Sequence, residues 1–270
     1  MKNYLEIQKN GFVLFKEVFS PVDLDVVRSS VNKIFSDDIS FFDEHINPEG
    51  MKYYTFKKDI LEIAEIRELI FSSEFISRVK SVLNTEKIIY FGDSSLMVNA
   101  GERGFHKDNI QRSNPNSNEW NSDYDIVRVG IYLQDTSKYS GGLQLRKGSH
   151  RSSNRWKGKI FTALAEQGDF LVWKLTTTHS GNTLIPRIFG DKLKLIPRIT
   201  TWLPRSFFKP YDKNRIAIFM AFANYNSTYV DDYINFLKNQ PYKKDFNNDS
   251  VNQSFKLNCI NEGLFFRDNL

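Results

Sequence analysis

Apolar residues recur at helical spacing in the first third of the chain. Ser20 followed by Pro21 is typical of a helix start, because the serine hydroxyl accepts a backbone hydrogen bond and proline fits the first helical position. The residues that follow are apolar at every third or fourth position, which predicts an amphipathic helix. A stretch from about residue 59 to 83 repeats this spacing, and the polar residues at Ser72 predict a break in it. Residues 1–86 are therefore predicted to be a mainly helical flank.

From residue 87 to about 225 the chain changes to short runs of β-branched and aromatic residues separated by polar turns. Such runs are typical of strands, and several of them in one region predict a closed β core. We interpret them as the strands of a double-stranded β-helix, the cupin-like jelly roll, with the N-terminal α-helices packed on its outside. The predicted fold class is thus mainly β. The clearest runs are residues 127–133, 143–145, 170–175 and 216–222.

The run from Val127 to Leu133 alternates strictly between apolar residues and others. Because side chains alternate along a strand, its branched apolar residues share one face, and Arg128 and Tyr132 share the other. We interpret the second face as the interior of the barrel, where Arg128 and Tyr132 would contact substrate or co-substrate. The alternative is a face toward water, on which the two residues are only the polar side of the strand.

Length and composition limit the number of domains. The chain has 270 residues, of which 40% are hydrophobic, and this is enough to bury a substantial core. A β-rich core of this size is commonly one domain. We predict a single domain, residues 1–270, in which residues 226–270 form a C-terminal extension to the core.

The sequence carries no sign of a membrane span. No run approaches 18 apolar residues, and the first residues contain no apolar signal segment. The single cysteine, Cys259, permits no disulfide within the chain, which fits a reducing compartment. We therefore expect a cytoplasmic protein.

His106, Asp108 and His179 are the strongest candidate functional residues. His106 and Asp108 follow one predicted strand and His179 follows another, so all three would lie at the ends of rigid elements. Two imidazoles and one carboxylate hold one face of a ferrous ion and leave the other face open for O2 and an organic co-substrate. In the alternative interpretation each histidine makes an ordinary hydrogen bond. Of the remaining histidines, His150 is assigned to a structural turn and His45 to the surface.

Short motifs extend this pattern along the chain in a definite order. They are Gly11–Phe15, Phe19–Leu24, His106 with Asp108, Gly141–His150, Gly168 with Asp169, and His179. In order and spacing they resemble the phytanoyl-CoA dioxygenase family over about residues 8–225, and the Gly-Gly-x-Leu to Gly-Ser-His segment is the most specific part. That family uses Fe(II) and 2-oxoglutarate, so the resemblance implies Fe(II) as the metal, with 2-oxoglutarate and O2 as co-substrates.

The resemblance also implies an arginine that holds the distal carboxylate of 2-oxoglutarate. In the family this arginine opens the strand after the second histidine ligand, and its planar guanidinium suits a carboxylate because two parallel hydrogen bonds form. Arg187 lies 8 residues after His179, close to the usual spacing. Arg215 lies 36 residues after His179 but opens the only convincing strand of that region. We favour Arg215 and keep Arg187 as the alternative.

The choice of Arg215 implies a basic insertion at about residues 183–214. The insertion contains seven Lys or Arg against two Asp, with aromatic residues among them. It is either a solvated loop that shares the chain's net charge of +5, or a lid whose cations and rings contact the substrate. In the second interpretation, Arg198, Trp202 and Arg205 bind the substrate.

Together these features predict an Fe(II)- and 2-oxoglutarate-dependent dioxygenase. We expect a hydroxylase that acts on a small-molecule or glycan-type substrate with an anionic group, in a biosynthetic or modification pathway. The alternative is a jelly-roll protein that binds a ligand without turnover, but the complete set of three metal ligands favours the enzyme. A halogenating enzyme is disfavoured because Asp108 occupies the position that chloride would need. Nucleic acid is not an expected partner, because the excess charge is modest and no recognition motif is present.

Overall fold

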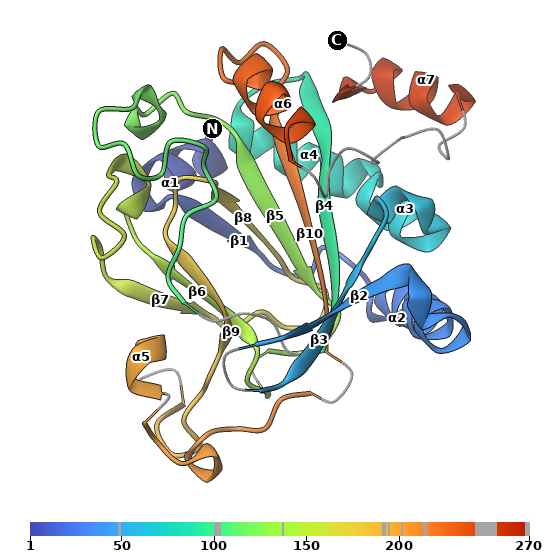
Figure 1. Ribbon diagram of the computed structural model, residues 1–270. Coiled ribbons are helices and arrows are strands. Elements are labelled where there is room, and N and C mark those ends of the chain that lie inside the picture. The colour runs from blue at the N-terminus through green and yellow to red at the C-terminus, as the bar shows by residue number, and fades with distance from the viewer. Residues whose placement is uncertain are drawn as a thin grey trace.

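Two sheets, one large and one small, make up the centre of the molecule (Figure 1). The computed structural model describes residues 1–47, 50–99, 104–136, 138–190, 193, 195–200, 202–212, 215–240 and 253–267. The large sheet has the order β1 (Phe12–Phe15), β8 (Phe170–Lys174), β5 (Val127–Tyr132), β10 (Ile216–Asn224), β4 (Ile88–Asn99), β3 (Lys52–Phe56) and β2 (Phe42–Ile46). A further strand, β11 (Leu264–Phe266), pairs with β4 in parallel, whereas the neighbours in that order are antiparallel. The small sheet has the antiparallel order β7 (Ile160–Ala163), β6 (Gly142–Arg146) and β9 (His179–Thr183).

β10 runs through the middle of the large sheet, between β4 and β5. Its sequence, Ile-Ala-Ile-Phe-Met-Ala-Phe-Ala-Asn, is apolar almost throughout because both faces of the strand are covered. Ile218 and Met220 join the core beneath the helices, whereas Ala217 and Phe219 belong to the cluster on the side of the small sheet. One face of β10 therefore packs against the helices, and the other face packs toward the small sheet.

Helices cover the outer face of the large sheet. The serine cap predicted at Ser20 is present, since its hydroxyl accepts from the backbone N–H of Asp23. At the predicted break, the hydroxyl of Ser72 accepts from the backbone N–H of Phe75 and caps α4 (Ser73–Leu83). The ring of Phe75 packs 5.0 Å from that of Phe170, which joins helix and sheet in one core. The helices of this N-terminal part are α1 (Lys2–Asn10), α2 (Pro21–Asp37), α3 (Ala64–Ile70) and α4 (Ser73–Leu83).

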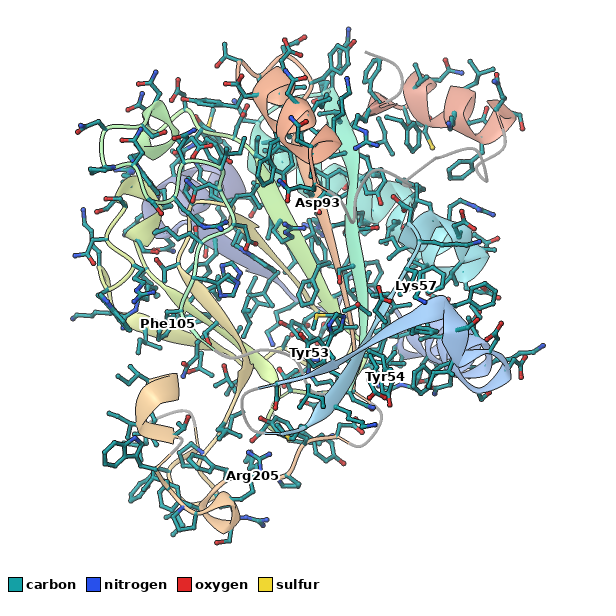
Figure 2. All side chains as sticks on the ribbon, viewed as in Figure 1. Tyr53, Tyr54, Lys57, Asp93, Phe105 and Arg205 are labelled. Atoms are coloured by element: carbon teal, nitrogen blue, oxygen red, sulfur yellow. The ribbon has the colours of Figure 1, made fainter. Side chains whose placement is uncertain are left out.

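The inner face of the large sheet carries two separate apolar clusters, and side chains fill the space between the ribbons (Figure 2). One cluster contains Trp173 and Leu143 and joins the large sheet to the small one. The other lies beneath α6 (Val230–Lys238) and contains Tyr233. At Gly130 a Cβ atom would lie 2.9 Å from the Trp173 ring, so only glycine leaves room for this indole.

The first 86 residues contain more strand than their sequence pattern predicted. β1 lies in this region, and so does the β2–β3 hairpin, which extends the large sheet beyond β4. Helices still make up most of residues 1–86, but the hairpin was not predicted, because Tyr53, Tyr54 and Thr55 favour extended backbone in a run too short to show a period. With α6 and α7 (Gln253–Asn261) added, the molecule is mixed α/β with antiparallel sheets rather than mainly β.

The last described strand, β11, extends the large sheet by pairing with the first residues of β4. β11 places Leu264 and Phe266 against the outer core, and the rings of Phe265 and Tyr225 lie 4.2 Å apart. No helix in the described part of the chain is both long enough and apolar enough to cross a membrane.

Candidate metal centre

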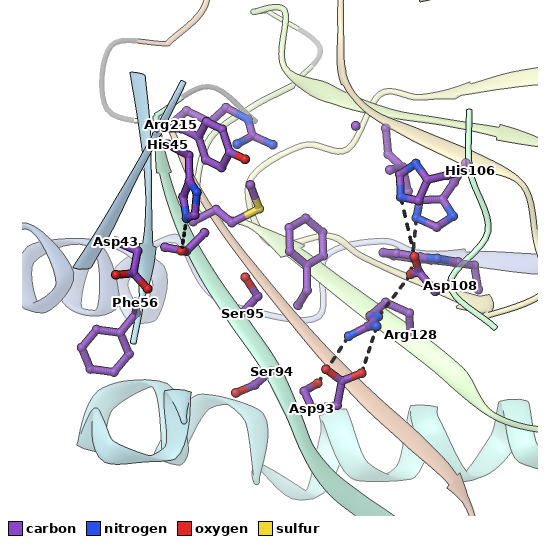
Figure 3. A pocket seen from close by; sticks show the side chains of 18 of the residues that line it. Asp43, His45, Phe56, Asp93, Ser94, Ser95, His106, Asp108, Arg128 and Arg215 are labelled. Carbon is purple, nitrogen blue, oxygen red and sulfur yellow. Dashed lines mark hydrogen bonds and ion pairs between the residues drawn. The ribbon is translucent and has the colours of Figure 1, made fainter. Parts of the chain in front are cut away.

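His106, Asp108 and His179 lie close enough to bind one metal ion. One ligand atom from each residue lies within 4.8 Å of the others. Nε2 of His106 is 3.6 Å from Oδ1 of Asp108, and Nε2 of His179 is 3.5 Å from Oδ2 of Asp108 (Figure 3). Among the residues that the structure describes, no other group of three potential ligands meets this criterion.

Both imidazoles are fixed with the same nitrogen toward the site. Nδ1 of His106 lies 2.8 Å from the carbonyl oxygen of Gly104, and Nδ1 of His179 lies 3.0 Å from that of Thr177. A carbonyl oxygen only accepts a hydrogen bond, so each Nδ1 carries the proton and each Nε2 keeps its lone pair. Hydrogen bonds of this kind set the tautomer and the ring orientation of metal-binding histidines.

The backbone explains how ligands so distant in sequence come together. His106 and His179 face each other as an antiparallel bridge, with both N–H···O distances at 2.9 Å, and Asp108 N–H donates to the Leu175 carbonyl at 3.0 Å. Because extended residues alternate in direction, Lys107 points away from its two neighbours. Its buried ammonium donates to the carbonyls of Ser149 and Thr176, which holds the ligand segment against the β8–β9 connection.

Asp108 stays ionised because Arg128 and the two imidazoles lie beside it. Burial by itself would raise the pKa of this carboxyl, but His179, Arg128 and His106 outweigh burial and hold the pKa below its usual value. Nε of Arg128 lies 3.5 Å from Oδ2 of Asp108, and another nitrogen of the same guanidinium lies 2.9 Å from Asp93. Asp93 also accepts a hydrogen bond from the Tyr233 hydroxyl. Arg128 therefore spans two carboxylates, as Figure 3 shows, and faces the interior as its position in the strand predicted.

Arg215 is a buried cation without a carboxylate beside it. The side chain is 2% exposed; Nε donates to the Gly141 carbonyl at 2.9 Å and another nitrogen donates to the Asn99 carbonyl at 2.8 Å. Its guanidinium carbon lies 5.7 Å from the centre of the Tyr132 ring. Among the described residues no Asp or Glu is within ion-pair distance of Arg215, and burial lowers its pKa. A buried arginine of this kind is suited to receive an anion from outside the chain.

Arg187 has a different environment. It is exposed, and its Nε donates to the Phe208 carbonyl at 2.8 Å. It does not line the cavity beside the three ligands, whereas Arg215 does. The geometry thus supports Arg215 as the arginine near the metal ligands.

The three ligands open into a cavity of about 590 Å3 between the sheets. Strand alternation selects its lining: Asp93, Ser95 and Met97 of β4 face the cavity, whereas Leu96 and Val98 pack beneath the helices. Further walls come from β6, β8, β9 and β10, which contribute Leu143, Trp173, Gly181 and Phe219. Such a cavity is large enough for a small molecule.

The β2–β3 hairpin closes one side of this cavity, and the sequence did not indicate that role. His45 was assigned to a surface loop, but it lies in β2 and lines the cavity, with Nε2 2.8 Å from the Thr55 hydroxyl (Figure 3). Its ring stacks on Tyr53 at 4.9 Å. The hairpin residues that face the cavity alternate along each strand, with Asp43 and His45 in β2 and Tyr53 and Thr55 in β3. This alternation is the sequence signal that could have indicated the role of the hairpin.

Of the other residues predicted to bind substrate, Tyr132, Trp202 and Arg205 do not line this cavity. Trp202 is 83% exposed, and the guanidinium of Arg205 lies over the Tyr211 ring at 4.0 Å. Tyr132 is buried beneath Arg215, and its hydroxyl has no hydrogen-bond partner among the described residues. The side chain of Arg198 is outside the described part of the structure, and so are Asp191, Lys192, Lys194 and Lys213 of the basic insertion.

His150 gives an expected pH dependence of stability. It is buried, Nε2 lies 3.1 Å from the Gln8 carbonyl, and burial lowers its pKa from 6.5 to about 3. The unfolded chain therefore takes up the proton first, so the contribution is full above pH 6.5 and is lost on acidification. Between pH 7 and pH 5 we expect His150 to cost the metal-free protein about 2 kcal/mol of unfolding free energy.

Urea unfolding of the wild type and His150→Gln at pH 7 and pH 5 measures this contribution. Glutamine can donate to the same carbonyl but does not titrate, so the variant should lose less stability on acidification. Equal losses in the two proteins would show that His150 does not set this dependence.

Comparisons with known proteins agree with the site. The family model for phytanoyl-CoA dioxygenase (PhyH) matches residues 7–184. The epimerase SnoN from nogalamycin biosynthesis has a similar fold, with a TM-score of 0.57, 13% identity, and coverage of 83% of this chain and 82% of that one. A SnoN structure contains Fe3+, α-ketoglutarate and nogalamycin RO. The carbocyclase SnoK from the same pathway also gives 0.57, with 12% identity and 83% of each chain covered.

One similarity points elsewhere. The regulatory protein RecX of Clostridium perfringens is 23% identical over 188 residues, which is 67% of this chain and 86% of that protein. An identity this low does not by itself indicate a shared activity, and the family match and the solved structures agree with each other instead.

The antiparallel sheets and the two-histidine, one-carboxylate site define an oxygenase of the non-haem Fe(II)- and 2-oxoglutarate-dependent class. The chain belongs to the phytanoyl-CoA dioxygenase family.

Proposed function

We propose that this protein is a hydroxylase that acts on a polar, glycan-type small molecule in a biosynthetic or modification pathway. His106, Asp108 and His179 would hold Fe(II), and Arg215 would hold the distal carboxylate of 2-oxoglutarate. The two sheets would form the double-stranded β-helix of the class. The observation that carries the proposal is the cavity beside the three ligands, which joins the metal site to a wall of hydrogen-bonding side chains.

The residues present fit the implied metal and co-substrate. Two imidazole nitrogens with free lone pairs and one ionised carboxylate suit Fe(II) and leave coordination positions open. When bound, iron with 2-oxoglutarate and O2 supplies an oxidation in which the oxoacid loses CO2 and the substrate gains oxygen. The uncompensated guanidinium of Arg215 matches the carboxylate that this co-substrate brings.

Arg128 is proposed as a positioning residue rather than a substrate anchor. Its charge is already engaged by Asp93 and by Asp108, so little of it is left for a substrate anion. Contact with Oδ2 of Asp108 limits rotation of this carboxylate about its side-chain bond. Such outer contacts orient metal ligands and strengthen metal binding.

The cavity wall favours a substrate with hydroxyl or amine groups. Ser95 faces the cavity, and its hydroxyl has no hydrogen-bond partner among the described residues. Asp43, His45 and Thr55 add donors and acceptors on the hairpin side. Buried polar groups need partners, so a bound substrate should supply them. An anionic group on the substrate would meet Lys57, which lies at the cavity 3.6 Å from Asp43.

The proposal is tested by supplying the iron-loaded enzyme with panels of polyhydroxylated or aminated molecules and, separately, of aliphatic acyl thioesters. We expect succinate formation to be stimulated by a member of the first panel, and mass spectrometry to show a product that has gained one oxygen atom. Ser95→Ala should raise the KM for that substrate about threefold to tenfold by removing one hydrogen bond. The surface variant Ser77→Ala is the matched control and should change nothing. Preference for the aliphatic panel, or a product without added oxygen, would refute the proposal.

A further inference from the structure

The segment between β9 and β10 projects from the body of the molecule. We define the basic projection as residues 186–209. Its two ends are held together by backbone hydrogen bonds, from Lys209 N–H to the Ile185 carbonyl at 2.8 Å and from Arg187 N–H to the Phe207 carbonyl at 3.0 Å. From this base it extends past the small sheet and carries the short helix α5 (Pro197–Thr200) (Figure 1).

The basic projection exposes large apolar side chains. Ile188 is 80% exposed, Phe189 54%, Leu193 36%, Ile199 48% and Trp202 83%. In the described part of the chain, five of the fourteen large apolar residues that are this exposed lie in this one segment. Single exposed apolar residues are ordinary, but a concentration of them marks an interaction surface.

The basic projection also carries the excess charge of the protein. Its sequence contains six Lys or Arg against one Asp, a net charge of +5. The whole chain also has a net charge of +5, so the remaining residues are neutral overall. Arg205 lies on this segment, away from the metal-site cavity (Figure 2). Among the described residues no acid forms an ion pair with Arg187 or Arg205.

We propose that the basic projection docks the enzyme on an anionic lipid surface. Cations that attract lipid headgroups, together with tryptophan and aliphatic side chains that enter the interface, are the combination that interfacial segments use. A second copy of the chain is disfavoured as the occupant, because two projections with charges of +5 would repel each other. A nucleic acid would leave Ile188, Leu193 and Ile199 in water.

The base of the basic projection lies near Arg215, since Gly141 donates to the Thr183 carbonyl and accepts from Arg215. The basic projection leaves the strand that begins with His179 and returns to the chain just before Arg215. The polypeptide therefore enters and leaves the docking segment near the proposed co-substrate arginine. The inference goes beyond the proposed function and does not depend on it, because binding to lipid requires neither metal nor turnover.

Vesicle co-sedimentation of the full chain tests the proposal. The protein should bind vesicles of phosphatidylcholine with phosphatidylglycerol, and at least about tenfold more weakly to phosphatidylcholine alone, since each basic residue near an anionic surface adds about fivefold. Raising NaCl from 0.1 M to 0.5 M should weaken binding by screening these charges. Tryptophan fluorescence should shift to the blue on binding in the wild type but not in Trp202→Phe.

Matched variants locate the docking surface. Ile188→Ser/Trp202→Ser should reduce vesicle binding at least about tenfold, because two apolar side chains no longer enter the interface. Ile39→Ser/Trp156→Ser removes an exposed isoleucine and an exposed tryptophan elsewhere and should bind like the wild type. Equal binding of the two double variants, or no preference for anionic vesicles, overturns the proposal. So does self-association in sedimentation that Ile188→Ser/Trp202→Ser alone abolishes, since the occupant would then be a second copy.

Discussion

Replacing His106 or Asp108 by alanine is expected to abolish 2-oxoglutarate turnover and stoichiometric metal binding while leaving the fold intact. Each substitution removes one of the three protein ligands. Among the described residues, no other group of three potential ligands could replace this site. Neither side chain belongs to an apolar cluster of the core, so the melting temperature of the metal-free protein should change little. The measurements are metal content after anaerobic loading with Fe(II), succinate formation, and circular dichroism.

Two comparisons make this result specific. His45→Ala removes a histidine that lines the same cavity but lies on the hairpin, so metal binding should persist in that variant. The purified wild type is also expected to carry Ni, Co or Zn in place of iron, because ferrous iron is low in the affinity order. Undiminished stoichiometric metal binding by the His106→Ala/Asp108→Ala variant would refute the assignment of these ligands.

The regular elements near the site could be predicted because their patterns are local. The run predicted at residues 127–133 is β5 (Val127–Tyr132), and the runs at 170–175 and 216–222 correspond to β8 and β10. Strict alternation in β5 placed Arg128 and Tyr132 on one face, which was interpreted as the interior, with a face toward water as the alternative. Arg128 lines the cavity. Where one face of a strand is buried and the other carries polar residues, the alternation of apolar and polar residues indicates the face on which each side chain lies.

Contacts between distant segments could not be predicted in this way. Asp93 lies in an apolar run that gives no hint of its ion pair with Arg128, 35 residues later. The bridge between His106 and His179 depends on how two loops meet, and hydrophobic periodicity carries no information about that. The chemistry of the ligand set and the family resemblance, rather than any spacing rule, joined these two histidines in one site.

The β2–β3 hairpin as a whole could not be predicted from the sequence either. Its strands are five residues each, and only β3 has a β-prone composition. Phe42 and Phe56 pair across the hairpin and join the outer core, but this pairing is visible only in three dimensions. The cavity wall that would contact substrate was therefore the part of the site that could be predicted least well from the sequence.

Arg215→Ala is expected to raise the 2-oxoglutarate requirement more than a hundredfold, whereas Arg187→Ala should leave it nearly unchanged. The difference follows from burial: Arg215 is 2% exposed with no acid partner among the described residues, and Arg187 is exposed and outside the cavity. Removing one member of a buried ion pair costs on the order of 3 to 5 kcal/mol. The measurement is succinate formed as a function of 2-oxoglutarate concentration, together with direct binding of 2-oxoglutarate to the metal-loaded protein.

Arg215 also donates to the carbonyls of Gly141 and Asn99, so a loss of structure must be separated from a loss of the co-substrate contact. Arg215→Lys keeps the positive charge but not the planar pair of donors, and should fall between the wild type and Arg215→Ala in 2-oxoglutarate affinity. Metal binding at His106, Asp108 and His179 should survive in both variants, because Arg215 does not contact these ligands. If Arg187→Ala instead proved the more damaging change, the co-substrate arginine would lie at the base of the basic projection, and the cavity beside Arg215 would have a different ligand.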